Sequence, residues 1–256
     1  LAALLTVLAA ALLAGTTLLA KALGTDTLGP PLHPLQISHG RFLFALLAIS
    51  VTVALVRPRF TRPDLRTHLN PVLGMILAIP LLGERVGPVR WAAAVIALTG
   101  AAILIRPGSG VVETGALLAL GAALCLGAEL IFLKRLSGRE GPWQILLVNN
   151  AIGLSIATLA VIWVWAPPTP AQWAALAALG VLMALAQMAF VNAMARGDAS
   201  YVAPFFYTAL IFAGLYDGLV FGVWPDITSI TGAAVILCGA ELLIWREGRR
   251  RRVPVT

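Results

Sequence analysis

The sequence predicts an all-α integral membrane protein whose helices cross the bilayer repeatedly. The first observation is composition: 60% of the 256 residues are hydrophobic, 11% are charged, and the mean hydropathy is +0.93. A soluble domain carries about 25% charged residues, so this chain cannot cover a water-facing surface. The second observation is that the apolar residues form long runs, and the third is that these runs recur in two matching halves.

Most of the apolar runs approach or reach the roughly 17–25 residues that a membrane-spanning helix requires. One run, Asn70–Gly83, has only 14 residues and is too short to cross alone. It leads into a polar hinge, Gly83–Pro88, and then Trp91, which is typical of a tight turn at the water interface. The predicted spans are Leu1–Leu23, His33–Val56, Trp91–Ile105, Gly115–Leu133, Pro142–Trp165, Ala171–Ala195, Tyr201–Gly222 and Ile227–Trp245.

The two halves of the chain repeat. A shift of 107 residues matches Pro63 with Pro170, whereas a shift of 139 matches Gly83 with Gly222. A shift of 108 also matches two Pro-x-Gln-Ile segments, 34–37 and 142–145. The shift therefore grows by 32 residues after Pro63. We expect the first half to lack one span and the beginning of another, and the sequence to omit about one span of the complete molecule.

The distribution of basic residues gives an independent check on the number of spans. With ten spans and both termini cytoplasmic, 15 of the 18 Lys and Arg residues fall in inside loops or the C-terminal tail. Only Lys21 and Arg106 fall outside, and Arg41 lies within a span. A nine-span arrangement would move the four arginines between residues 57 and 66 outside, against the positive-inside rule. Ten spans are therefore predicted.

Five spans per half is an odd number, so the two halves insert in opposite orientations. Such an inverted repeat places a pseudo-two-fold axis in the membrane plane and a substrate site near the midplane. The predicted division is a first repeat over residues 1–107, a second repeat over 108–246, and a basic cytoplasmic tail over 247–256. This arrangement is common among transporters and rare among membrane enzymes.

Two local features give the chain a family resemblance. The turn Leu81–Glu84, which is followed by Pro88, precedes a glycine-punctuated helix that ends in Ile103–Ile105. Together with Arg41 in the second span, this pattern resembles the EamA-repeat family of the drug/metabolite transporter superfamily and is similar to its YddG-type amino-acid exporters. The chain departs from the family at Val223–Pro225, where the second repeat lacks a Gly-Glu turn.

The resemblance implies a fold of ten helices, arranged as two inverted five-helix EamA repeats. It also implies a cavity and a transport function. It implies a central cavity lined mainly by the first, third, fourth, sixth, eighth and ninth spans, with alternating access. It implies export of small organic metabolites, with amino acids, including aromatic and hydrophobic ones, as the substrate class. The expected location is the bacterial inner membrane, where the partners are the lipid bilayer and a small-molecule substrate. A monomer is expected, with a homodimer as the alternative.

Polar groups at membrane depth are the candidate site residues, because a charge there costs roughly 2.5–3.5 kcal/mol on insertion scales. Glu129 lies in a cavity-lining span, although pairing with a nearby basic residue would explain it equally. Asp217 lies toward the outer end of its span, where a gate or interfacial role is the alternative. Gln187 offers a neutral amide to the cavity or to a neighbouring helix. Asn150 and Asn149 instead match the polar positions around Arg41 and indicate a structural layer.

The other candidates are one amide and two aromatic side chains. Asn70 precedes Pro71, where a broken helix exposes backbone groups to a ligand. Tyr207 and Trp163 could pack against a substrate side chain, although lipid-facing or packing roles are common for such residues. The complete predicted substrate-binding set is Glu129, Gln187, Asn70, Tyr207, Trp163 and Asp217.

Other function classes find little support in the sequence. No nucleic-acid partner is expected, since the basic residues lie in loops and a tail beside the membrane. A membrane-embedded transferase would need a convergent His or Asp cluster, whereas the three His residues are scattered at positions 33, 39 and 68. We expect no cofactor, no metal and no catalytic residues. Carriers of nucleosides, sugars or drug-like cations remain the alternatives within the transporter class.

Overall fold

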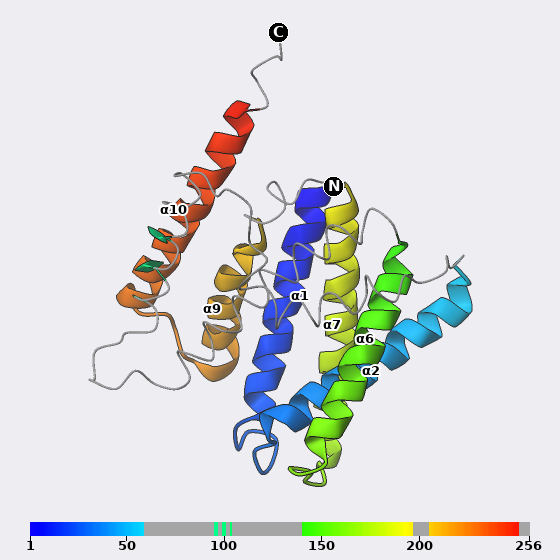
Figure 1. The fold of residues 1–256 in the computed structure, drawn as a ribbon. Coiled ribbons are helices and arrows are strands. Elements are labelled where there is room, and N and C mark those ends of the chain that lie inside the picture. Colours follow the sequence, from blue (N-terminus) through cyan, green and yellow to red (C-terminus); the bar gives the residue numbers. More distant parts are fainter. Residues whose placement is uncertain (59–94, 97–98, 101–102, 104–139, 197–204, 251–256) are drawn as a thin grey trace.

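The computed structural model describes residues 1–58, 95–96, 99–100, 103, 140–196 and 205–250. Within these residues the fold is entirely helical, with no strand. Four helices are long and apolar enough to cross a membrane, and two more are shorter or contain a shorter apolar segment. The helices are α1 (Ala2–Leu23), α2 (Pro34–Val56), α6 (Pro142–Val161), α7 (Pro170–Arg196), α9 (Thr208–Phe221) and α10 (Ile227–Arg250) (Figure 1).

The residues at the N-terminal ends of α2 and α6 explain where these helices begin. Both helices begin at a proline, Pro34 and Pro142, in the matched Pro-x-Gln-Ile segments. Proline suits the first helical position because its fixed φ is helical and its missing N–H needs no partner there. At α2 the cap is completed by His33, whose Nδ1 accepts a hydrogen bond from the Leu35 N–H. The glutamines of both segments are buried.

One predicted boundary is wrong by several residues. The span predicted as Pro142–Trp165 stops being helical at Val161, and residues 162–169 form a turn and an extended loop. Pro167 and Pro168 keep the end of this loop out of a helix, because a proline disfavours helical geometry at the residue before it. The predicted start of the next span at Tyr201 lies outside the described residues. Residues 205–206 are helical, and α9 begins at Thr208.

Helix α7 is the centre of the described bundle. It packs against α1, α2 and α6, while α1 also packs against α9 and α2 also packs against α6 (Figure 1). Small residues permit the close crossing of α2 and α7, as is common between membrane helices. At Gly180, an added Cβ would lie only 2.8 Å from the backbone nitrogen of Ala45.

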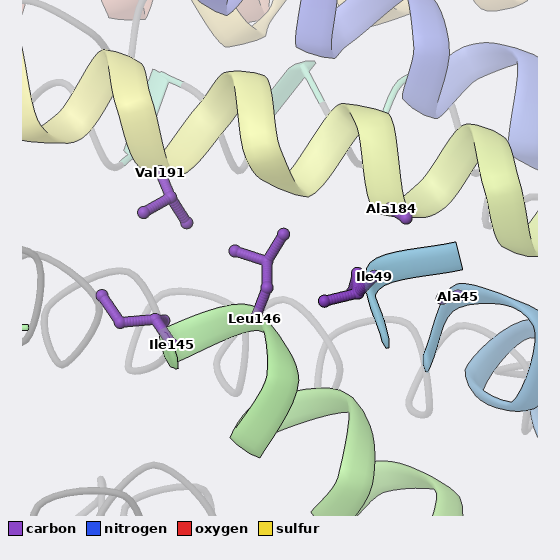
Figure 2. Packing of buried hydrophobic residues seen from close by; sticks show 6 residues of the cluster. All are labelled: Ala45, Ile49, Ile145, Leu146, Ala184 and Val191. Atoms are coloured by element: carbon purple, nitrogen blue, oxygen red, sulfur yellow. The ribbon is translucent and has the colours of Figure 1, made fainter. Parts of the chain in front are cut away.

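The buried apolar contacts lie where these helices cross. Figure 2 shows one cluster in which side chains of α2, α6 and α7 meet. Its members are Ala45, Ile49, Ile145, Leu146, Ala184 and Val191. A second cluster joins α1, α2 and α7 near the C-terminal end of α1. Large apolar side chains such as Leu55, Leu219 and Ile227 are exposed on the outside of the helices, which is the surface that a lipid bilayer covers.

Three connections lie at one end of the bundle, which we call the loop end. They are residues 24–33 after α1, residues 162–169 after α6, and residues 222–226 after α9 (Figure 1). The N-terminus of α1 lies at the opposite end (Figure 1). In the topology predicted from the basic residues, the loop end faces outward.

Candidate functional site

Two groups of polar side chains connect different helices of the described structure. One is an amide pair between α6 and α7, and the other is an ion pair between α1 and α9. The ion pair joins helices that are distant in sequence, whereas the amide pair joins two consecutive helices. Hydrogen-bonding groups inside a membrane bundle are the usual markers of a substrate path or of specific helix contacts.

The amide pair consists of Asn150 on α6 and Gln187 on α7. The Asn150 Nδ2 donates to Gln187 Oε1 at 2.8 Å and to the Leu146 carbonyl oxygen at 2.8 Å. Asn150 is 1% exposed, and its Oδ1 is a buried oxygen that accepts no hydrogen bond from the described residues. Leaving such a group unpaired costs about 1–3 kcal/mol. The amide pair therefore places an unused acceptor beside the partly buried Gln187.

The ion pair joins the C-terminal turn of α1 to α9. Lys21 Nζ lies 2.9 Å from Asp217 Oδ1, and it also lies 4.6 Å from the centroid of the Phe221 ring. The side chains of Lys21 and Asp217 are 42% and 37% exposed. The sequence reading singled out Asp217 but did not find its partner. The signal available was a lysine in the last turn of a membrane helix, where the helix dipole favours a cation.

The two aromatic candidates lie apart from the amide pair. Tyr207 directly precedes α9 and is partly buried. Its neighbour Phe206 packs against Phe190 of α7, with ring centroids 5.0 Å apart. Trp163 lies in the turn after α6 and is 80% exposed. That is the setting of a tryptophan at the membrane–water interface.

The remaining predicted site residues, Glu129 and Asn70, lie outside the described residues. Of the four that are described, Gln187 and Asp217 belong to different polar groups, and neither is bonded to Tyr207 or Trp163 in the described structure. The structure therefore does not gather these four side chains into one site. A role for each in substrate binding stays a prediction.

Sequence reasoning missed a set of buried glutamines that fasten the loop end. Gln36 at the start of α2 donates through Nε2 to the Ala166 carbonyl and accepts from the Ala166 N–H. Gln172 at the start of α7 donates to the Pro30 carbonyl at 2.7 Å and accepts from the Thr169 N–H. Both glutamines are 1% exposed. The only sequence signal was the Gln-Ile match between residues 36–37 and 144–145.

The chemistry of the described part is that of binding and helix docking. Its polar contacts include neutral amides, hydroxyls and the Lys21–Asp217 ion pair, which can hold polar parts of a ligand or join helices. Among the described residues, no group of three or more His, Cys, Asp or Glu side chains could hold a metal ion.

An all-helical membrane chain with repeated helix starts and polar contacts between distant helices is typical of a transporter-like fold. Residues 113–245 match the EamA-like transporter family, which is more than half of the chain. The chain belongs to this family.

Relatives of known name are similar over much of the chain. The riboflavin transporter of Rhizobium johnstonii is 38% identical over 193 residues, which cover 72% of this chain and 62% of that protein. The riboflavin transporter of Vibrio cholerae is 31% identical, with the same two coverages. The S-adenosylmethionine uptake transporter of Rickettsia bellii is 24% identical and covers 88% of this chain and 77% of that protein. The match thus spans about three fifths of the length of the two riboflavin transporters.

A solved crystal structure shares the fold. It superimposes with a TM-score of 0.60 over 91% of this chain and 97% of that one, at 19% sequence identity. At this identity the similarity concerns the fold alone.

Proposed function

We propose that this protein is a secondary transporter that moves a small organic metabolite across the bacterial inner membrane by alternating access. Its membership of the EamA-like transporter family is the observation that carries the proposal. The structure supports it through helices from opposite ends of the sequence that pack together, such as α1 against α7 and α9. In transporters with inverted repeats, the substrate site lies between such halves.

Export of amino acids is the first substrate proposal. It rests on the resemblance of the Leu81–Glu84 turn and the following helix to amino-acid exporters. A zwitterionic substrate needs groups of both charges or helix ends near its path. Asp217 and the predicted site residue Glu129 would suit the ammonium group, and amide donors such as Gln187 would suit the carboxylate.

Riboflavin, or a similar planar heterocycle, is the second substrate proposal. It rests on the two relatives named as riboflavin transporters, at 38% and 31% identity. The ring edge of such a molecule carries neutral donors and acceptors. A neutral amide pair like Asn150 and Gln187 is chemically suited to groups of that kind.

The proposed mechanism has the two repeats rocking about the central site, with both termini cytoplasmic and the loop end outward. A monomer suffices for this cycle. If transport is coupled to protons, Glu129 and Asp217 are the proposed carriers, since carboxylates at membrane depth are the usual proton relays. Full transport by a Glu129→Gln variant would count heavily against the coupling role.

Flux from proteoliposomes tests the function and separates the two substrates. Vesicles containing the full-length gene product are loaded with an amino-acid mixture and with riboflavin, and efflux is followed with and without a proton gradient. Selective loss of amino acids supports the first proposal, and selective loss of riboflavin supports the second. Retention of both, with protein shown to be folded, would contradict both substrate proposals and direct the search to nucleosides, sugars or drug-like cations.

A further inference from the structure

The loop end is fastened in two very different ways. Between residues 24–33 and 162–169, buried side chains make hydrogen bonds to backbone groups: Gln36 to Ala166, Gln172 to Pro30, and Thr169 Oγ1 to the Leu28 carbonyl. The glutamine side of these bonds is shielded from water, because Gln36 and Gln172 are both 1% exposed, whereas their backbone partners belong to the exposed residues Ala166 and Pro30. At this end, α1, α2, α6 and α7 are thus held together as one block.

Helix α9 is attached to that block by a contact that water reaches. It packs against α1, and the polar link in the described structure is the Lys21–Asp217 ion pair, whose side chains are 42% and 37% exposed. Both charges can be hydrated when they separate, so breaking the pair costs far less than breaking buried amide bonds. The contact between α1 and α9 is therefore the weaker contact at the loop end.

The end of α9 packs against the turn that follows it. Gly222 ends the helix in the left-handed conformation, with φ 67°, and the chain then folds back against the helix. An added Cβ at Gly218 would lie 2.7 Å from the Trp224 ring, and one at Gly214 would lie 3.5 Å from Pro225. The turn is thus packed onto α9 rather than onto the block.

The cation of the pair also contacts an aromatic ring on α9. Phe221 lies four residues after Asp217, on the same face and one turn nearer the loop end. Its ring centroid lies 4.6 Å from Lys21 Nζ. Asp217 and Phe221 both contact the ammonium group, which favours one docked position of α9 over loose apolar contact.

We propose that the Lys21–Asp217 ion pair is a latch that holds the loop end closed along the α1–α9 contact and is released when α9 moves away from α1. The proposal rests on the proposed transport function for its purpose. The closure itself can be measured without any substrate.

Thiol labelling of a reporter on α9 tests the latch. Ala213 lies four residues before Asp217, on the same face of α9 and one turn further from the loop end, and it is partly buried. In the full-length protein, freed of other cysteines and reconstituted in vesicles, Ala213→Cys is exposed to a membrane-impermeant thiol reagent. We expect slow labelling in this parent protein. Lys21→Met or Asp217→Asn should raise the labelling rate about fivefold, the upper range for an exposed ion pair.

Two further variants make the result specific. The exchanged protein, Lys21→Asp with Asp217→Lys, restores an ion pair and should label slowly again. Asp26→Asn removes another carboxylate of the loop end, one that makes no ion pair in the described structure, and should leave the rate unchanged. Equal rates in all proteins, or fast labelling of the exchanged protein with unchanged thermal unfolding, would overturn the latch.

The latch and the transport function fail in distinguishable ways. If the labelling pattern appears but no substrate moves, the transport function is wrong while the latch stands. If substrate moves but labelling ignores the ion pair, only the latch is wrong.

Discussion

At the scale of single residues, Asn150 is the clearest case of a buried polar group with a defined task. It bonds to Gln187 across the α6–α7 contact and lies beside the apolar cluster that contains Leu146. Hydrogen bonds between membrane helices contribute about 0.6 kcal/mol on average and up to about 1.7 kcal/mol. The main effect of the pair is therefore to fix the position of α6 against α7, and its contribution to the free energy of unfolding is small.

Replacing Asn150 with Ala should lower the free energy of unfolding by about 0.6–1.7 kcal/mol, because Gln187 Oε1 loses its donor. Thermal unfolding in detergent measures the change. Asn149→Ala is the matched control, since this neighbour makes no side-chain hydrogen bond in the described structure. An equal loss in both variants would show that the amide pair is not the cause.

Gly180 is the residue on which the approach of α2 to α7 depends. An added methyl group would lie 2.5 Å from Phe44 Cβ and 2.8 Å from the Ala45 nitrogen, and backbone cannot move aside cheaply. We expect Gly180→Ala to destabilise the protein by about 1–3 kcal/mol, the usual cost of overpacking. Gly15→Ala, where the nearest atom to the added Cβ is Leu182 Cδ1 at 3.7 Å, should not destabilise the protein in the same thermal unfolding measurement.

At the scale of elements, the loops of the loop end are held by helix-borne amides. Gln36 satisfies both backbone groups of Ala166, and replacing it with Leu would remove both bonds. We expect faster hydrogen exchange at the Ala166 amide. The free energy of unfolding should fall by about 0.5–1.5 kcal/mol, the usual net contribution of a hydrogen bond, because Ala166 is exposed and water can replace Gln36.

Gln144 is a matched control for Gln36, because it occupies the equivalent position of the repeat and is also buried. Its side chain donates to Glu140 Oε2 at 3.1 Å, near its own helix start. Gln144→Leu should leave exchange at Ala166 unchanged. Faster exchange at Ala166 in that variant would mean that general loosening, rather than loss of the Gln36 bonds, opens the loop.

The elements themselves could largely be predicted from the sequence. Apolar runs of spanning length and proline at helix starts located α1, α2, α6 and α7 to within a few residues. The end of α6 was missed because the apolar run continues through Trp163 and Trp165, while the helix stops before Pro167. Apolar character indicates which residues a bilayer covers. It does not determine the backbone conformation, and so it does not show where the helix ends.

The partners of the polar residues could not be predicted in the same way. Lys21 and Asp217, or Gln36 and Ala166, are far apart in sequence, and no periodicity connects them. Their meeting depends on how α1 packs against α9 and on where the loops cross. The sequence therefore indicated Gln187 and Asp217 as candidates, while Asn150 and Lys21 became their partners only in the folded structure.

At the scale of the whole molecule, the hydrogen bonds between loops make the topology testable. Residues 24–33 and 162–169 touch through Thr169 and Leu28, so they must lie on the same side of the membrane. If both termini are cytoplasmic, a single cysteine that replaces Asp26, Trp163 or Val223 should react with an impermeant thiol reagent added outside. A cysteine at Glu140 should react only from inside. Labelling of the loop-end positions from opposite sides would contradict the inverted arrangement.

Transport by alternating access predicts counterflow, in which unlabelled substrate inside a vesicle speeds the uptake of labelled substrate. This can be measured with the substrate identified in the flux assay. Vesicles preloaded with unlabelled substrate should take up labelled substrate faster than empty vesicles and should accumulate it transiently above equilibrium. A carrier that exposes its site to one side at a time produces this overshoot. Equal uptake in loaded and empty vesicles, with no overshoot, would contradict alternating access in this protein.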